Sequence, residues 1–112
     1  EVPKPEVRVE PPVQLPPQNP ASTQVIEQGE RLFTAYCSRC HVFGPSITPD
    51  LRRIDPAVRA RIRNIVLDGE RAPNGMGRFR DVLTESDLNA IGAYLLDQAW
   101  QLYRVENAAV PR

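Results

Sequence analysis

Apolar residues recur at helical spacing in two segments in the middle of this chain. The first segment runs from about Gln24 to the first cysteine, and Ser22 or Thr23 is a suitable N-cap residue for it. The second begins at Asp55 and Pro56, because an N-cap residue followed by proline is a helix start signal. We expect this second helix to run unbroken to about Leu67. Each segment has one apolar face, which predicts that each packs one side against a shared core.

A third helical segment follows Thr84, where Asp87 stands three positions later in a capping-box pattern. Its apolar positions end near residues 102–103. The stretches 42–51 and 69–83 contain glycine and proline between these helices, and we expect both to be loops. No segment alternates clearly between apolar and polar residues. The sequence therefore predicts an all-α fold with about three main helices.

The first twenty residues have a different composition from the rest of the chain. They hold seven of the twelve prolines and no aromatic residue. We therefore expect an extended, Pro-rich linker or tail at 1–20, followed by one folded domain at 21–112. No apolar run is long enough to span a membrane. The chain begins at Glu1 without a signal peptide, which we interpret as a mature or excised form.

The net charge is zero, but it is unevenly distributed. Residues 31–80 hold ten arginines against four acidic groups, a net charge of +6, and each flanking part has a net charge of −3. Two interpretations fit: a solvated face with local ion pairs, or an arginine-rich collar that pairs with anionic groups and attracts acidic partners. The neutral total and the absence of a recognised motif argue against nucleic-acid binding.

Both cysteines and the single histidine lie in the run Cys37-Ser38-Arg39-Cys40-His41. Cys-x-x-Cys-His is the attachment signature of a c-type haem. Two thiols about one turn apart can reach two vinyl groups of a porphyrin, and the next residue can present an imidazole to the iron. A zinc site would need a fourth ligand, and a thioredoxin-like redox pair would need a βαβ context. A pair of buried free cysteines would leave the adjacent histidine unexplained. The motif therefore predicts one covalent haem c, with His41 as an axial iron ligand.

Met76 is the only methionine and the candidate for the sixth iron ligand. It stands between Gly75 and Gly77, which allow the backbone to approach a haem closely. The alternative is a loop methionine that fills a gap in the core. Ligation by histidine and methionine would raise the reduction potential and close the iron to oxygen. Those properties suit one-electron transfer.

Other residues are candidates for the surroundings of the haem. A ligating imidazole normally donates its other N–H to an acceptor, and the carbonyl of Pro49 is a suitable one. Four side chains can donate to the haem propionates: Arg52, Arg53, Arg78 and Trp100.

Together these motifs make residues 24–103 resemble a class I cytochrome c. The resemblance implies a cytochrome c fold, in which the first helix packs on the last and a Pro-x-Leu run supplies the acceptor for the haem histidine. It also implies a methionine as the sixth ligand, although here glycine rather than proline follows it. The matching positions are Gly29, Phe33, Pro49, Leu51, Met76, Ile91 and Tyr94.

Four runs, 49–52, 65–69, 74–79 and 95–100, are similar to the cytochrome domain of quinohaemoprotein alcohol dehydrogenases. In those enzymes a domain that holds pyrroloquinoline quinone (PQQ) oxidises an alcohol, and a Pro-rich linker leads to the haem domain that takes the electrons. The resemblance implies a periplasmic electron carrier, not an enzyme by itself. Its donor would be a PQQ-dependent dehydrogenase, and its acceptor a cytochrome, a cupredoxin or an oxidase.

Two other functions stay open on the sequence. One is a free-standing periplasmic cytochrome c that is unrelated to a quinoprotein. The other is a haem enzyme or gas-sensing domain, in which the sixth ligand is displaceable.

Overall fold

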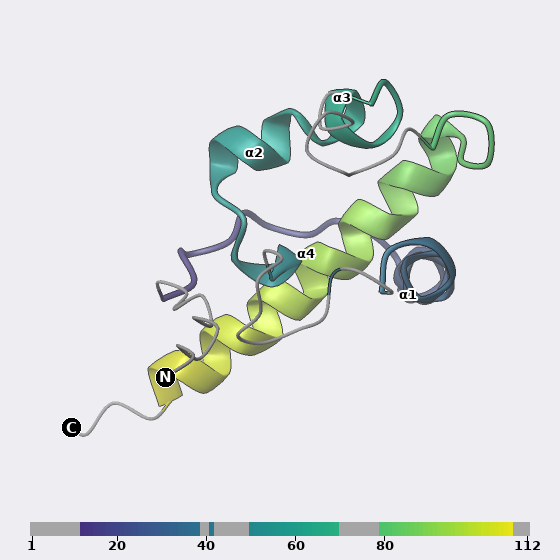
Figure 1. The fold of residues 1–112 in the computed structure, drawn as a ribbon. Coiled ribbons are helices and arrows are strands. Elements are labelled where there is room, and N and C mark those ends of the chain that lie inside the picture. Colours follow the sequence, from purple (N-terminus) through teal and green to yellow (C-terminus); the bar gives the residue numbers. More distant parts are fainter. Residues whose placement is uncertain (1–11, 39–40, 42–49, 70–78, 109–112) are drawn as a thin grey trace, which may run out of the picture.

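The computed structural model describes residues 12–38, 41, 50–69 and 79–108. In chain order these contain α1 (Thr23–Tyr36), the short 3₁₀ helix η1 (Leu51–Arg53), α2 (Pro56–Ala60), α3 (Ile62–Val66) and α4 (Glu85–Ala108). Helix α4 is the long axis of the fold, α1 crosses it, and α2 and α3 lie along its other side (Figure 1). The described part of the chain has no strand, so the predicted all-α class is confirmed. None of its helices combines the length and the apolar character needed to cross a membrane.

Helices α1 and α4 make their closest approach at Gly29. A Cβ atom added there would lie 1.8 Å from the carbonyl oxygen of Ala90 and 2.8 Å from Cβ of Tyr94, so only glycine fits. One turn later, the rings of Phe33 and Tyr94 have their centroids 5.5 Å apart. The expected contact between the first and last helices is therefore confirmed, with Ala90 at the point of closest approach and Ile91 in the adjoining buried cluster.

A single apolar core lies between α1, α3 and α4. Cys37 at the end of α1 and Leu51 of η1 both pack against this core. The core consequently borders the first cysteine of the haem motif directly. Its buried members are Phe33, Val66, Leu67, Leu83, Leu88, Ile91, Tyr94 and Leu95.

The second predicted helix is divided in two at Arg61. This residue has φ −101° and ψ 9°, outside the helical region, and its N–H donates to the carbonyl of Val58 at 3.0 Å. The expected start is confirmed, because the Asp55 carboxylate caps α2 by accepting from the Val58 N–H at 2.8 Å. The expected unbroken helix is wrong. The change of direction at Arg61 allows α3 to bury Ile65 and Val66, whereas α2 has no buried residue.

Helix α4 begins as predicted and ends later than predicted. The side chains of Thr84 and Asp87 each accept from the other's backbone N–H, at 3.1 and 3.0 Å, which is a capping box. The helix continues beyond residues 102–103 to Ala108. In its last turns Glu106 binds Val13 and Arg53, which are far away in the sequence. The local pattern of apolar residues does not predict such contacts.

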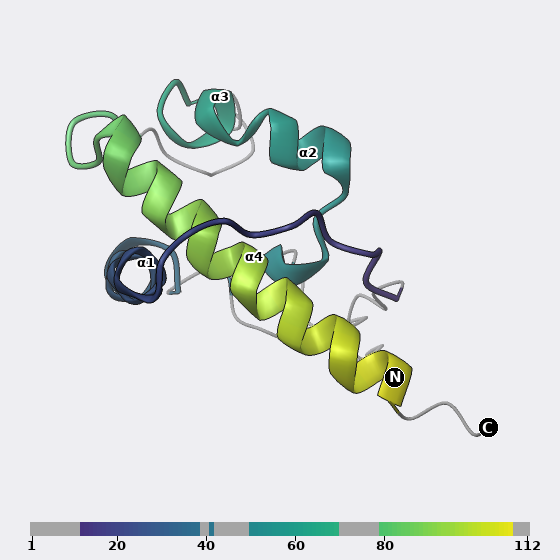
Figure 2. The ribbon, with the colours of Figure 1, turned by 180° about the vertical axis from the view of Figure 1, so that it is seen from behind.

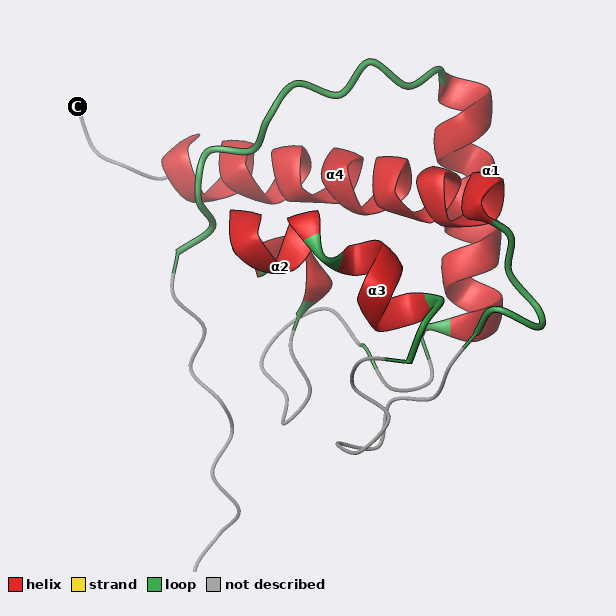
Figure 3. Cartoon of the chain, turned by 90° about the horizontal axis from the view of Figure 1, so that it is seen from above, coloured by secondary structure: helices red, strands yellow, loops and turns green. Residues whose placement is uncertain are grey.

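Residues 12–20, here called the strap, lie along α4 in an extended path without helix or strand (Figures 2 and 3). Pro16 is buried, and the indole N–H of Trp100 donates to the carbonyl of Pro17 at 2.8 Å. The side-chain amide of Asn19 donates to the carbonyl of Ala93 at 3.0 Å. The extended form agrees with the Pro-rich composition, but the contacts with α4 were not predicted.

Candidate haem-binding site

The first cysteine lies in a hydrogen-bonded turn that follows α1. The N–H groups of Cys37 and Ser38 both donate to the carbonyl of Phe33, at 2.8 and 3.0 Å, and the Ser38 hydroxyl donates to the carbonyl of Thr34 at 2.7 Å. The N–H of His41 then donates to the carbonyl of Cys37 at 3.0 Å. These bonds set Cys37 and His41 one turn apart. This is the spacing that covalent haem attachment followed by histidine ligation requires.

The surroundings of Cys37 suit the edge of a porphyrin. The side chain is half-buried against the apolar core, and this burial raises the pKa of its thiol to about 11. Burial therefore disfavours a charged group at this position. A thioether carries no charge and is compatible with such an environment. The donor set and the apolar contact surface together fit a covalently attached haem.

Four of the predicted site residues, Pro49, Cys40, Met76 and Arg78, lie outside the described residues. Their roles stay predictions.

The segment that contains Met76 is flanked by residues that bind one another. The N–H of Phe79 donates to the carbonyl of Val66 at 2.9 Å, and Arg80 forms an ion pair with Asp68. These contacts join the end of α3 to the residues that lead into α4. They hold the two described ends of the segment close to the apolar core.

Arg63 adds two further ion pairs at this junction. Arg63 of α3 lies 3.3 Å from the Asp68 carboxylate and also pairs with Glu85 at the start of α4. Contact with Arg63 lowers the pKa of Glu85. These groups are exposed, so each pair contributes little to stability by itself. Their effect is to fix the positions of three neighbouring segments.

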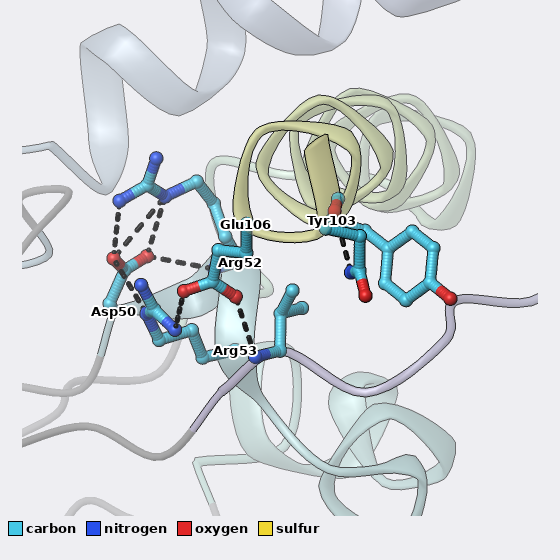
Figure 4. A network of polar contacts seen from close by, with 7 residues as sticks. Asp50, Arg52, Arg53, Tyr103 and Glu106 are labelled. Atoms are coloured by element: carbon cyan, nitrogen blue, oxygen red, sulfur yellow. Dashed lines mark hydrogen bonds and ion pairs between the residues drawn. The ribbon is translucent and has the colours of Figure 1, made fainter. Parts of the chain in front are cut away.

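Asp50, directly before η1, is 1% exposed and is the buried charged residue of the described fold. The Arg52 guanidinium binds it with two nitrogens, Nε to Oδ1 at 3.0 Å and Nη2 to Oδ2 at 2.7 Å (Figure 4). The backbone N–H of Arg52 donates to Oδ1 at 3.0 Å, and Nε of Arg53 lies 3.8 Å from Oδ2. Burial of a carboxylate is unfavourable unless it is paired and hydrogen-bonded, and both conditions are met here.

Glu106 near the end of α4 extends this cluster to the strap. Its Oε2 lies 3.0 Å from Nη1 of Arg53, and its Oε1 accepts from the N–H of Val13 at 2.9 Å. The Val13 N–H, together with Arg53, lowers the pKa of Glu106. The Asp50 network, as we call these five residues, links the strap, α4 and η1. Its members are Val13, Asp50, Arg52, Arg53 and Glu106.

The structure shows what three of the four predicted propionate donors bind. Trp100 directs its one N–H to Pro17 and has none left for a propionate. Arg52 and Arg53 both bind carboxylates of this chain, so their role toward a haem stays a prediction. Sequence reasoning did not find Asp50 as the centre of a network. The available signal was an acidic residue followed by two arginines just before a helix start.

The basic middle of the chain is partly used in internal ion pairs. Of the seven described arginines in 31–80, four bind carboxylates: Arg52, Arg53, Arg63 and Arg80. Within the described ranges, Arg31 and Arg59 form no ion pair. Asp50 and Asp68 are already included in the net charge of +6, so of these paired carboxylates only Glu85 and Glu106 offset the excess. Local ion pairs therefore coexist with a remaining positive charge that can attract an acidic partner.

Comparison with known proteins gives two groups of relatives. Residues 24–95 match the family model described as cytochrome c oxidase, cbb3-type, subunit III. The chain is 31% identical to the quinohemoprotein alcohol dehydrogenase ADH IIB of Pseudomonas putida, over 88% of this chain and 16% of that protein. It is 35% identical to cytochrome c6 of Bumilleriopsis filiformis, over 68% of this chain and 94% of that protein.

A solved structure agrees with the first group. The quinohemoprotein alcohol dehydrogenase ADHIIG of Pseudomonas putida superimposes with a TM-score of 0.77 at 32% identity, over 93% of this chain and 15% of that one. The chain thus spans about a sixth of the quinohemoprotein relatives, and most of the length of the small one.

Proposed function

The chain belongs to the cytochrome c family of electron-transfer domains, and from this premise we propose that it carries one haem c, attached to Cys37 and Cys40 and ligated by His41 and Met76. We further propose that it works in the periplasm and accepts single electrons from a PQQ-dependent dehydrogenase. It passes them to a cytochrome, a cupredoxin or an oxidase.

The observation that carries the proposal is the turn between Cys37 and His41 on the edge of the apolar core. Backbone hydrogen bonds hold this turn, and the core side chains against which Cys37 packs are apolar. When bound, haem supplies an iron that alternates between the ferric and ferrous states. His41 and Met76 would ligate that iron, and ligands retained in both oxidation states would limit the rearrangement that accompanies each electron.

The link to a quinoprotein is supported by the matches to the two Pseudomonas putida alcohol dehydrogenases. The match to ADH IIB covers 88% of this chain, so it includes much more than the haem motif. The alcohol-oxidising part of those enzymes has no counterpart in this chain. This chain would therefore serve as the electron-accepting domain or subunit.

Covalent haem and a closed iron can be tested on one preparation of the chain. We expect the intact mass to increase by one haem, and the ferrous protein to bind carbon monoxide slowly or not at all. An unchanged mass would exclude a c-type haem. Rapid carbon monoxide binding would instead favour the haem enzyme or gas sensor.

A free-standing carrier is the second candidate, and the cytochrome c6 relative favours it because the chain covers 94% of that protein. An immunoblot of the periplasmic fraction of the source cell, probed with an antibody against this chain, separates the two. A band near 12.6 kDa would support the free-standing carrier. A much larger band would support a domain of an enzyme.

Attraction of an acidic partner predicts that the bimolecular electron-transfer rate falls as ionic strength rises. Arg31 on α1 is exposed and belongs to the basic part of the chain. We expect Arg31→Gln to lower the rate at low salt by roughly threefold. Arg104→Gln is the matched control, since it removes the same charge from an exposed position on α4 outside the basic part. Stopped-flow kinetics would test both, and equal effects of the two substitutions would contradict a docking role for Arg31.

A further inference from the structure

The side chain of Glu106 on α4 links the strap to η1, although Val13 of the strap is 93 residues away from it in the sequence. Glu106 accepts from the Val13 N–H with one carboxylate oxygen and binds Arg53 with the other. Figure 4 shows Glu106 on α4 beside Arg53, with Asp50 on the far side of the arginines. The carboxylate therefore lies at the point where the strap, α4 and η1 meet.

The neighbouring segment η1 borders the candidate haem-binding site. Leu51, the first residue of η1, packs against the same apolar core as Cys37. Asp50 immediately precedes it, and its carboxylate is removed from solvent. Movement of Arg52 or Arg53 would disturb this carboxylate. We therefore expect a substitution of Glu106 to shift Arg53, and through it Asp50 and the neighbouring Leu51.

The charges of the Asp50 network balance, because two carboxylates face two guanidinium groups. Loss of the Glu106 charge would leave one excess positive charge next to a buried carboxylate. Buried charges are screened by salt much less than exposed ones, so this excess would act on the neighbouring site. A positive charge favours the reduced form of a nearby redox centre.

We propose that Glu106 is a positioning residue of the haem site, which fastens the strap to η1 and neutralises Arg53. In this arrangement residues 12–20 are a part of the cytochrome domain rather than a loose linker. The inference about the reduction potential rests on the proposed haem, whereas the inference about the strap does not.

Three variants of the haem-loaded chain test the proposal by two measurements, the reduction potential and the hydrogen-exchange rate of the Val13 amide. Glu106→Gln removes the charge but keeps an oxygen that can accept from Val13. Glu106→Ala removes both. Asp97→Asn is the matched control, because it removes a carboxylate from the same helix outside the network, where Asp97 binds Gln101 at 2.8 Å.

We expect both Glu106 variants to shift the potential upward by more than the control does. Only Glu106→Ala should accelerate exchange at Val13, by roughly tenfold, since a hydrogen bond to a charged group contributes on that scale. Equal potential shifts in Glu106→Gln and Asp97→Asn would overturn the positioning role. Unchanged exchange in Glu106→Ala would overturn the attachment of the strap. A chain without covalent haem would instead contradict the proposed function, and the exchange measurement would still test the strap.

Discussion

Replacing Gly29 with Ala is expected to lower the free energy of unfolding by about 3 kcal/mol or more. The new Cβ would lie 1.8 Å from the carbonyl oxygen of Ala90 and 2.5 Å from its carbonyl carbon, so α1 and α4 would have to separate. For a domain of this size the melting temperature should fall by roughly 15 °C. Thermal and urea denaturation, followed by helical circular dichroism, would measure both quantities.

The sign of this effect distinguishes packing from helix propensity. Alanine is the better helix former by about 1 kcal/mol, so propensity alone would make Gly29→Ala stabilising. Gly92 on α4 offers a matched control, because a Cβ there would meet nothing within 4 Å. We expect Gly92→Ala to raise stability by about 0.5–1 kcal/mol. If both variants are stabilised alike, the close crossing of α1 and α4 is wrong.

The sequence predicts features that depend on neighbouring residues. Asp55 and Thr84 begin their helices as expected, because a cap needs only the three or four residues that follow it. The resemblance to class I cytochromes c, which includes Gly29, predicted that the first helix packs on the last, and the structure shows that contact at Gly29. The turn between Cys37 and His41 follows from a five-residue motif. These elements locate the candidate site.

The features that were missed depend on residues far apart in the chain. The break at Arg61 comes from the burial of Ile65 and Val66 against α4, since no glycine or proline stands at that position. Trp100 was named as a candidate propionate donor. Its N–H instead binds the carbonyl of Pro17, which was not foreseen because Pro17 is 83 residues away in the sequence. A pattern of apolar and polar positions describes faces of helices, but it does not state which distant segments cover them.

The strap shows a second limit of composition. Seven prolines in twenty residues predict an extended chain, and the described part of this stretch, 12–20, contains neither helix nor strand. They do not indicate whether that chain is solvated or packed. The carbonyl of Pro17 in the strap accepts from the indole N–H of Trp100 on α4. In the other direction, the side chain of Asn19 in the strap donates to the carbonyl of Ala93 on α4. The same composition thus suits a fixed part of the domain.

Substitution of Met76 by Ala is expected to open the sixth coordination position. Ferrous protein should then bind carbon monoxide rapidly, and the reduction potential should fall, because thioether sulfur favours ferrous iron. The fall should be a fraction of a volt, within the span of about 0.8 V that axial ligands set. Flash photolysis and spectroelectrochemistry would measure the two effects. Circular dichroism of the variant would check that the folded state is retained.

Met76→His distinguishes the effect of an open coordination position from the effect of replacing the ligand. An imidazole at 76 can close the iron again, so carbon monoxide binding should be slow in this variant while the potential stays low. Agreement of both variants with these outcomes requires a ligand at position 76, since a side chain that only filled a gap in the core would change neither quantity. An unchanged spectrum and potential in Met76→Ala would show that another group closes the iron. The chain has no second histidine or methionine to do so, and the sixth ligand would then have to be of another chemical type.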